Sequence, residues 1–367
     1  MHVSVLGGGV AGALLAWRLA RQPDVERVSI APGAARKRDA TAASGGAVRG
    51  FEMEPGQRRL AIDSLTELLA DDRLRDWAGY TVTGSIYRPL DPRPIRAAAA
   101  EVEASVPDSV ELLSAAQLHE RGWAMTDAEL ASSGVIAIAE RQAGYLDPDR
   151  LRGCVLADLA SRDNVDILPD GAVDELAPGE FRLAGTRHCC DVMVLATGAW
   201  TPALLAAAGW QRAGLRTKAI QYTVFGIDDW QPGTFVDETS GLYGKPAPDG
   251  LLLGLPTQAW QVEPDGVEVD QALSRSVFEL ASQRFPRLRL QSGARPVAAV
   301  DCYSTDFRLA LRPVLDSDDR VFSFTGGSGG AAKTALAASA RAAIQLTQGR
   351  RSDPHHQTLI GRRSDLS

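Results

Sequence analysis

The chain opens with two apolar segments separated by glycines. The first is short and predicts a buried strand over residues 1–6, whereas the second, at residues 13–20, has the length and spacing of a helix. Between them lies Gly7-Gly8-Gly9-Val10-Ala11-Gly12, the pattern G-x-G-x-x-G. A third apolar segment at residues 27–30 predicts another strand. Together these segments predict a β-α-β unit at the start of the chain.

The rest of the chain alternates between helical periodicity and short apolar runs. Helices are predicted at residues 57–71, from Asp147-Pro148 onward, and at 331–346. We expect an α/β fold in which a Rossmann-type nucleotide-binding domain of several segments carries an inserted β-rich (α+β) substrate domain. The nucleotide-binding domain is assigned to 1–80, 145–215 and 305–348, the substrate domain to 81–144 and 216–304, and a disordered tail to 349–367. Strands are predicted at residues 84–88, 133–138, 191–195, 221–226, 251–254 and 321–324.

Composition narrows the class of protein. The 367 residues carry a net charge of -7 without a long basic run, which argues against nucleic acid as a partner. No apolar stretch is long enough to span a membrane, and no leader peptide precedes the first strand. The four cysteines match neither a metal site nor a disulfide framework, so a cytoplasmic protein without bound metal is expected. The oligomeric state stays open.

The glycine motif indicates the binding of a dinucleotide. Gly7 permits the tight turn after the strand, Gly9 lets backbone approach a pyrophosphate, and Gly12 lets the helix pack closely on the strand. The helix N-terminus, with Val10 and Ala11, then faces the phosphates. A glycine-rich turn in an unrelated α/β domain is the alternative interpretation.

Further motifs follow in order along the chain. They are Ala40-Thr41-Ala42-Ala43-Ser44-Gly45-Gly46, Gly144-Tyr145-Leu146-Asp147-Pro148, Ala196-Thr197-Gly198-Ala199-Trp200 and the closing segment 326–333. With the first motif, they make the chain resemble, over nearly its whole length, the flavin-dependent amine and amino-acid oxidases of the D-amino-acid oxidase superfamily. The sarcosine oxidase and glycine oxidase branch is the most similar. The resemblance implies FAD as cofactor and hydride transfer from the C–H beside the nitrogen of a small amine or amino acid to flavin N5. The product is an imine, and O2 is the expected acceptor.

The resemblance also implies where FAD is bound. The loop at 325–330 precedes a helix, so its N–H groups and the helix dipole can face an electron-rich group, here the pyrimidine end of the flavin. The turn after the strand at 191–195 would lie near the diphosphate. Turns without ligand contact are the alternative in both places. The residues expected to bind the cofactor are Gly7, Gly9, Val10, Ala11, Gly12, Thr41, Ser44, Gly45, Thr197, Gly198, Trp200, Cys302, Gly327, Ser328, Gly329, Gly330, Ala331 and Ala332.

Two basic residues are candidates for catalysis in this resemblance. Lys333 matches the lysine that binds the substrate carboxylate in sarcosine oxidases, and Arg49 matches an arginine beside the flavin. A solvent-facing helix lysine and a surface arginine are the alternatives. Tyr222, Tyr243 and Trp260 would shape the substrate pocket, unless they are plain core residues.

The chain departs from the family pattern at several positions. The second strand ends at Ala31, where such sites usually place a carboxylate for the ribose. Residues 254–260 lack the lysine that assists the reaction with O2 in sarcosine oxidases, and Lys245 is the nearest substitute. Cys302 lies near the position of a cysteine that forms a thioether to the flavin, so a covalent FAD is a hypothesis, with a buried free thiol as the default.

Other functions stay open at this point. A flavin dehydrogenase or monooxygenase is one alternative, although the Gly-Asp motif of the aromatic hydroxylases is replaced by Thr325-Gly326-Gly327. A flavoprotein-like scaffold without catalysis is another, favoured by Ala31. Lysine is scarce in this chain. Of the 39 lysine and arginine residues, only Lys37, Lys218, Lys245 and Lys333 are lysines.

Overall fold

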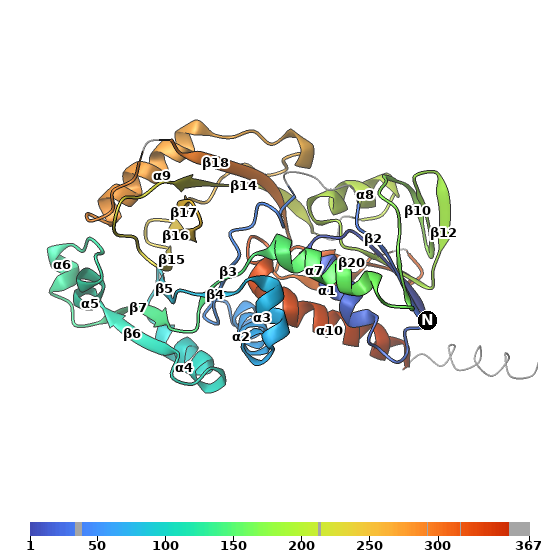
Figure 1. The fold of residues 1–367 in the computed structure, drawn as a ribbon, viewed down its shortest axis with the longest axis horizontal. Coiled ribbons are helices and arrows are strands. Elements are labelled where there is room, and N and C mark those ends of the chain that lie inside the picture. Colours follow the sequence, from blue (N-terminus) through green and yellow to red (C-terminus); the bar gives the residue numbers. More distant parts are fainter. Residues whose placement is uncertain (34–38, 212–213, 292, 316, 352–367) are drawn as a thin grey trace, which may run out of the picture.

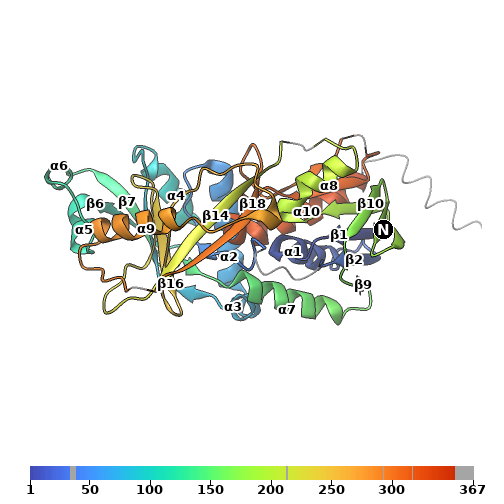
Figure 2. The same ribbon diagram turned by 90° about the horizontal axis from the view of Figure 1, so that it is seen from above.

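The chain folds around two large β-sheets. A computed structural model describes residues 1–33, 39–211, 214–291, 293–315 and 317–351. In Figure 1 the six-stranded sheet lies to the right and the eight-stranded sheet to the left. The view from above in Figure 2 shows the two sheets in the same order along the long axis of the molecule. The strand order of the first sheet is β19 (Ala310–Pro313), β20 (Val321–Thr325), β13 (Val192–Leu195), β1 (His2–Leu6), β2 (Arg27–Ala31) and β9 (Val165–Ile167).

The six-stranded sheet is parallel except for its edge strand β19. Its central strands β1 and β13 are almost wholly buried, as expected for a sheet covered on both faces. Helix α1 packs against α10 and α7, and α10 also packs against α2. Asp147 accepts hydrogen bonds from the N–H groups of Asp149 and Arg150, so α7 begins where the sequence predicts. These helices are α1 (Val10–Leu19), α2 (Pro55–Ala70), α3 (Asp72–Ala78), α7 (Pro148–Ala160) and α10 (Ala331–Arg351).

The eight-stranded sheet is mostly antiparallel and carries a separate core. Trp123 packs edge-on against Phe235 and Phe285, with ring centroids 5.6 and 5.1 Å apart. The structure adds helices that the sequence did not predict, among them α9 (Gln271–Arg284), α4 (Ile95–Ser105), α5 (Ala115–Glu120) and α6 (Asp127–Leu130). The strand order is β18 (Arg295–Tyr303), β14 (Arg216–Phe225), β17 (Gly250–Gly254), β16 (Leu242–Ala247), β15 (Thr234–Asp237), β5 (Ser85–Arg88), β7 (Val135–Glu140) and β6 (Val110–Ser114).

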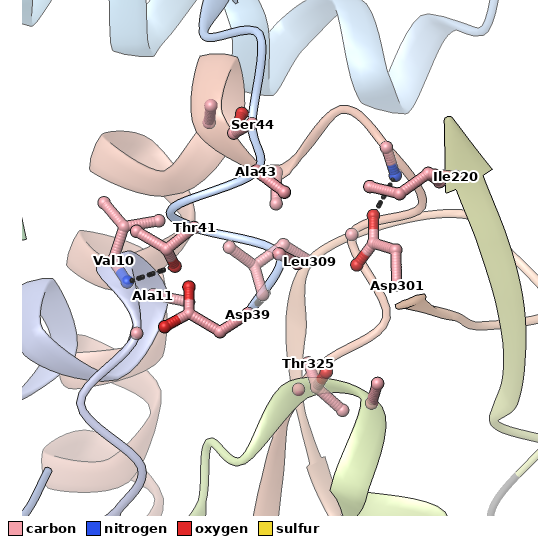
Figure 3. Close-up of a pocket in the computed structure, with 18 of the residues that line it drawn as sticks. Val10, Ala11, Asp39, Thr41, Ala43, Ser44, Ile220, Asp301, Leu309 and Thr325 are labelled. Atoms are coloured by element: carbon pink, nitrogen blue, oxygen red, sulfur yellow. Dashed lines mark hydrogen bonds between the residues drawn. The ribbon is translucent and has the colours of Figure 1, made fainter. Parts of the chain in front are cut away.

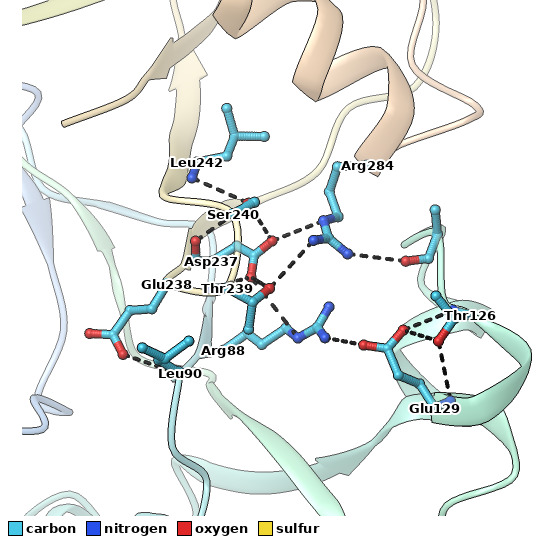
Figure 4. A network of polar contacts seen from close by, with 11 residues as sticks. Arg88, Leu90, Thr126, Glu129, Asp237, Glu238, Thr239, Ser240, Leu242 and Arg284 are labelled. Carbon is cyan, nitrogen blue, oxygen red and sulfur yellow. Dashed lines mark hydrogen bonds and ion pairs between the residues drawn. The ribbon is translucent and has the colours of Figure 1, made fainter. Parts of the chain in front are cut away.

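A buried carboxylate ties this second sheet to its helices (Figure 4). The side chain of Asp237 is fully buried and lies 2.9 Å from the Arg284 guanidinium of α9. Its oxygens also accept from the hydroxyls of Thr239 and Ser240. Because Asp237 is the last residue of β15 and Arg284 the last residue of α9, the network fixes the end of α9 against β15.

Small elements connect the two sheets. β3 pairs with β8, and β8 with β4, so the segment after the Ala40 loop is joined directly to the Gly144 motif. Two motifs that are distant in the sequence therefore lie side by side. The remaining elements are β3 (Ala47–Val48), β4 (Thr81–Val82), β8 (Gly144–Tyr145), β10 (Val173–Ala177), β11 (Glu180–Leu183), β12 (Thr186–Cys189), η1 (Gly198–Trp200), α8 (Thr201–Ala207) and η2 (Pro264–Gly266).

The predicted fold class is confirmed: a Rossmann-type sheet built from separate segments is combined with a β-rich unit. Because the two sheets form separate units, we propose the predicted division into a nucleotide-binding domain and a substrate domain. Helix α10 runs to Arg351, past the predicted start of a tail at residue 349, and residues 352–367 lie outside the described part. Within the described residues, no helix is long and apolar enough to cross a membrane. The four cysteines are free thiols.

Candidate functional site

One large cavity lies between the two sheets, and Figure 3 shows part of its wall. Its volume is about 1250 Å³, above the range of roughly 300–1,000 Å³ of ordinary small-molecule pockets. The wall therefore has room for a ligand of dinucleotide size together with a small substrate. The residues predicted to bind a cofactor that line it are Gly7, Gly9, Val10, Ala11, Thr41, Ser44, Gly45, Thr197, Gly198, Trp200, Gly327, Ser328, Gly329, Gly330, Ala331 and Ala332.

The N-terminal glycines form a cradle that side chains would fill. Gly7 has φ of +115°, and a Cβ added there would lie 2.4 Å from the Ala196 carbonyl oxygen. A Cβ on Gly12 would lie 2.0 Å from the Gly7 carbonyl oxygen. Gly12 is not part of the cavity wall; it lets α1 pack onto the turn, the role that the sequence assigned to it. The Val10 N–H donates to Thr41 Oγ1 at 3.0 Å, which fixes the Ala40 loop above the helix N-terminus.

Two carboxylates near the tip of β2 were missed by the sequence analysis. Ala31 lines the cavity without a carboxylate, as expected, but Asp39 and Asp170 also line it. Asp39 pairs with Arg152 of α7 at 2.7 Å, and its other oxygen accepts from the Ala42 N–H. These residues come from other segments than β2, so spacing along the chain did not indicate them. The basic residues 36–38, which follow β2, lie outside the described residues.

The loop after β20 is held in a strained conformation. Ser328 has φ of +57°, in the left-handed region that non-glycine residues seldom adopt. The Gly329 N–H donates to Asp301 Oδ2 at 2.6 Å, and burial raises the pKa of that carboxyl. Tyr303 forms an isolated bridge with Gly327. Strand β18 therefore sets the position of the loop that precedes α10, and strain of this kind is typical of ligand sites.

Lys333 and Arg49 meet in the cavity wall around one carboxylate. Lys333 Nζ lies 2.7 Å and the Arg49 guanidinium 2.6 Å from Glu52 Oε1. Burial would raise the pKa of Glu52, but the two cations outweigh it and hold the pKa below its usual value. Burial lowers the pKa of Lys333, against the opposing effect of Glu52. Glu52 itself does not line the cavity, so the cations stand between it and a ligand.

Lys245 lies in the wall on β16, beside the Ala40 loop. Its ammonium is 3.9 Å from the centre of the Tyr145 ring and donates to the Pro246 carbonyl at 3.0 Å. A Cβ added to Gly45 would lie 4.0 Å from Lys245 Cε. Burial is the chief cause that lowers the pKa of Lys245 to about 8. The structure thus brings the third predicted catalytic residue to the same cavity.

The aromatic residues predicted to shape the pocket differ in position. Tyr222 and Tyr243 line the cavity, and the Tyr243 hydroxyl donates to the Gln221 carbonyl at 3.1 Å. Trp260 is not part of the wall. Its ring lies 4.8 Å from the ammonium of Lys218, which does line the cavity and was not predicted.

Cys302 lies behind the wall rather than in it. On β18 the neighbouring residues Asp301 and Tyr303 line the cavity, and Cys302, between them, points to the opposite face. Its side chain is buried in a cluster with Leu215 and Val321. Burial is the chief cause that raises the pKa of its thiol to about 12. The structure therefore gives no support to a thioether, and the default reading of a buried thiol holds.

Comparison with known proteins agrees with this geometry. The family model described as FAD dependent oxidoreductase (DAO) matches residues 2–346. The chain belongs to that family. None of the curated proteins matches it. Family membership confirms the resemblance stated above and FAD as the cofactor.

Several solved structures share the fold at low sequence identity. Glycine oxidase from Geobacillus kaustophilus is 17% identical with a TM-score of 0.72, covering 94% of each chain. L-proline dehydrogenase from P. horikoshii is 17% identical with a TM-score of 0.74, covering 95% of this chain and 93% of that one. L-amino acid deaminase from Proteus myxofaciens is 15% identical with a TM-score of 0.69, covering 94% and 90%.

The residues present fit FAD. At Gly7 and Gly9, neighbouring protein atoms leave little room for a side chain, and both residues line the cavity. A pyrophosphate could therefore approach their backbone directly. The loop held by Asp301 stands at the other part of the wall, where its N–H groups suit the flavin ring. Asp39 and Asp170 are the carboxylates that line the cavity near Ala31, where the ribose would lie.

Proposed function

We propose that this protein oxidises the C–N bond of a small amine or amino acid that carries a carboxylate, giving an imine that water hydrolyses. The observation that carries the proposal is the position of Lys333 in the cavity wall. Glu52 is the one hydrogen-bonding partner of its ammonium among the described residues, so two of its three N–H donors are available to a ligand. A charge-assisted bond from Lys333 would hold the substrate carboxylate.

Each part of the wall then has a role in the reaction. FAD, when bound, supplies the ring that accepts a hydride from the carbon beside nitrogen. Lys333 orients the substrate through its carboxylate, and Arg49 adds positive charge beside the ring. The N–H groups of the 326–330 loop favour negative charge at its pyrimidine end. No side chain is assigned as a base, because the neutral amine reacts without one.

The two candidate functions, oxidase and dehydrogenase, differ in the final electron acceptor. The similar structures include both an oxidase and a dehydrogenase, so likeness does not decide between them. We favour O2, because Lys245 lines the cavity and supplies a positive charge beside it. A dehydrogenase is the second candidate, favoured by the absence of a lysine from residues 254–260.

A single series of measurements tests the proposal. The visible spectrum of the purified protein is recorded first, and then amines with and without a carboxylate are added without oxygen. We expect a yellow protein whose flavin absorbance is bleached by amines that carry a carboxylate, and recovers on mixing with air. A colourless protein that takes up no FAD would indicate the inactive scaffold instead. Bleaching without recovery in air would favour the dehydrogenase.

The reaction with O2 is expected to depend on the charge of Lys245. With its pKa near 8, the ammonium loses its proton as pH rises through about 8, and the positive charge that stabilises negative charge on oxygen is lost. The rate constant with O2 should therefore fall, by about 100-fold for full removal of the charge. Stopped-flow mixing with oxygen across pH 6–10, about the range that spans this pKa, measures it.

Two substitutions at Lys245 complete the test. Lys245→Met should react slowly at every pH, and Lys245→Arg should stay fast at high pH because arginine keeps its charge. Equal pH profiles for wild type and Lys245→Met would assign the pH dependence to another group.

Cys302 supplies a separate prediction about the cofactor. Because its thiol faces the core behind β18, we expect acid precipitation to release all flavin into the supernatant. Cys302→Ala should retain wild-type flavin content, losing only stability, by about 1 kcal/mol for the small cavity left. Colour that stays in the acid pellet of wild type and leaves that of Cys302→Ala would contradict the structure.

A further inference from the structure

The lysines of this chain are not distributed like ordinary surface residues. Lys218, Lys245 and Lys333 all line the same cavity, whereas arginine supplies the other basic residues of the described part. Lys37 lies outside the described residues. A lysine offers a compact point charge on a flexible stem, which suits an anionic ligand group of variable position. Each of the three therefore needs a partner or a ligand.

Two of these lysines have partners of their own. Lys333 pairs with Glu52, and Lys245 donates to a backbone carbonyl. Lys218 differs: within the described residues no carboxylate lies at ion-pair distance from it. Its ammonium lies 4.8 Å from the ring centre of Trp260 and 5.5 Å from that of Tyr303. Rings attract a cation without neutralising its charge.

The carboxylate on the neighbouring strand opposite Lys218 does not form an ion pair with it. Asp301 lies directly opposite Lys218 in the β14–β18 pair, and both line the cavity. One oxygen of Asp301 accepts from the Gly329 N–H and the other from the Cys302 N–H. Asp301 is thus committed to holding the loop, and Lys218, which lines the cavity, keeps a charge that no described carboxylate neutralises.

Lys218 stands at the substrate part of the cavity. It contacts Tyr303, whose hydroxyl lies 3.2 Å from the position of a Cβ on Gly329. The same loop reaches Lys333, whose Nζ lies 3.0 Å from a Cβ position on Gly330. Figure 3 shows Ile220 and Asp301 on the side of the pocket opposite Val10 and Asp39, which belong to the phosphate and ribose part.

We infer that Lys218 forms a second anion subsite, which binds an anionic group on the substrate at a distance from the carboxylate held by Lys333. The inference rests on the proposed function and names its substrate class: amines with two anionic groups, the second being a carboxylate or a phosphate. Trp260 and Tyr303 hold the ammonium in place by their rings. Lys218 is then the residue that selects the substrate.

The test uses the oxidised, flavin-loaded protein and its absorbance as the readout of ligand binding. It is titrated with acetate, with succinate and glutarate, and with 3-phosphonopropionate. We expect a doubly anionic ligand of matching length to bind more tightly than acetate. Lys218→Met should lower the affinity for that ligand roughly 10- to 100-fold, which corresponds to one charge-assisted hydrogen bond. The affinity for acetate should change less than about twofold. The phosphonate distinguishes a phosphate subsite from a carboxylate subsite.

A matched control lies on the same strand. Arg216 is exposed, lies over the same Trp260 ring at 4.5 Å and does not line the cavity, so Arg216→Gln should bind all ligands like wild type. Lys218→Arg should keep most of the preference. Equal affinity for acetate and the doubly anionic ligands in wild type would overturn the subsite, as would loss of FAD affinity in Lys218→Met. If the subsite fails this test but amines with one anionic group still bleach the flavin, the proposed function stands without the subsite. A protein that binds no flavin would overturn the proposed function and the subsite together.

Discussion

A Gly12→Ala variant is expected to be purified without flavin and with a lower melting temperature. A Cβ at this position would lie 2.0 Å from the Gly7 carbonyl oxygen and 3.0 Å from the Ala196 side chain. Backbone atoms cannot turn aside as a side chain does, so α1 must move away from the turn that holds the phosphates. Overpacking of this kind costs about 1–3 kcal/mol, and the displaced helix N-terminus also loses its bond to Thr41.

The control for this prediction is a glycine in another helix of the same domain. Gly153 lies in α7, is exposed, and an added Cβ would have no atom within 4 Å. Gly153→Ala should therefore keep the flavin and raise stability by about 0.5–1 kcal/mol. The ratio of visible to ultraviolet absorbance and thermal unfolding measure both effects. A yellow Gly12→Ala protein that melts at the wild-type temperature would show that α1 does not pack on the turn as described.

Lys333→Met is expected to remove most of the oxidation of carboxylate-bearing amines while the flavin stays bound. The lost charge-assisted bond to the substrate should lower kcat/KM by roughly 10- to 150-fold. The same substitution leaves Glu52 paired with Arg49, so the loss of stability should stay below the roughly 3–5 kcal/mol that an unpaired buried charge costs. Anaerobic flavin bleaching measures the first effect and thermal unfolding the second.

A double variant separates the two effects of Lys333. Adding Glu52→Gln to Lys333→Met removes the carboxylate that Lys333 pairs with, so the weak binding of the substrate carboxylate should persist even though the partner of Lys333 is also gone. Arg341→Gln, an exposed cation on the same helix, should change neither quantity. Recovery of kcat/KM in the double variant would show that Lys333 serves Glu52 and not the substrate.

Local sequence patterns predicted the parts of the site that are contiguous in the chain. Gly7, Gly9 and the closing glycines follow buried strands and precede helices, so strand, turn and helix are encoded within a few residues. Lys333 follows such a loop by a few residues, and its role was predicted from the resemblance to sarcosine oxidases. The α/β class follows from the same units, since parallel strands joined by helices form one kind of sheet.

The remaining wall residues depend on pairing between distant strands. Lys218 and Asp301 face each other only through the register of β14 and β18, which the sequence does not show. A shift of one residue would turn Cys302 into the cavity and Asp301 away from it. Lysine scarcity was the one signal that pointed to Lys218. Glu52 gave none, because it lies in a loop and acts through contacts with Arg49 and Lys333.

The six-stranded sheet has a consequence for the synthesis of the chain. β1 and β2 leave the ribosome first, but their neighbour β13 ends at Leu195, and α10, which covers α1, ends at Arg351. The part of α1 that packs against α10 therefore lacks this partner until nearly the whole described chain has been made. Domains that are closed by their last segment cannot finish folding during translation. We expect the nascent N-terminal segment to bind chaperones for longer than a contiguous Rossmann domain of the same size would.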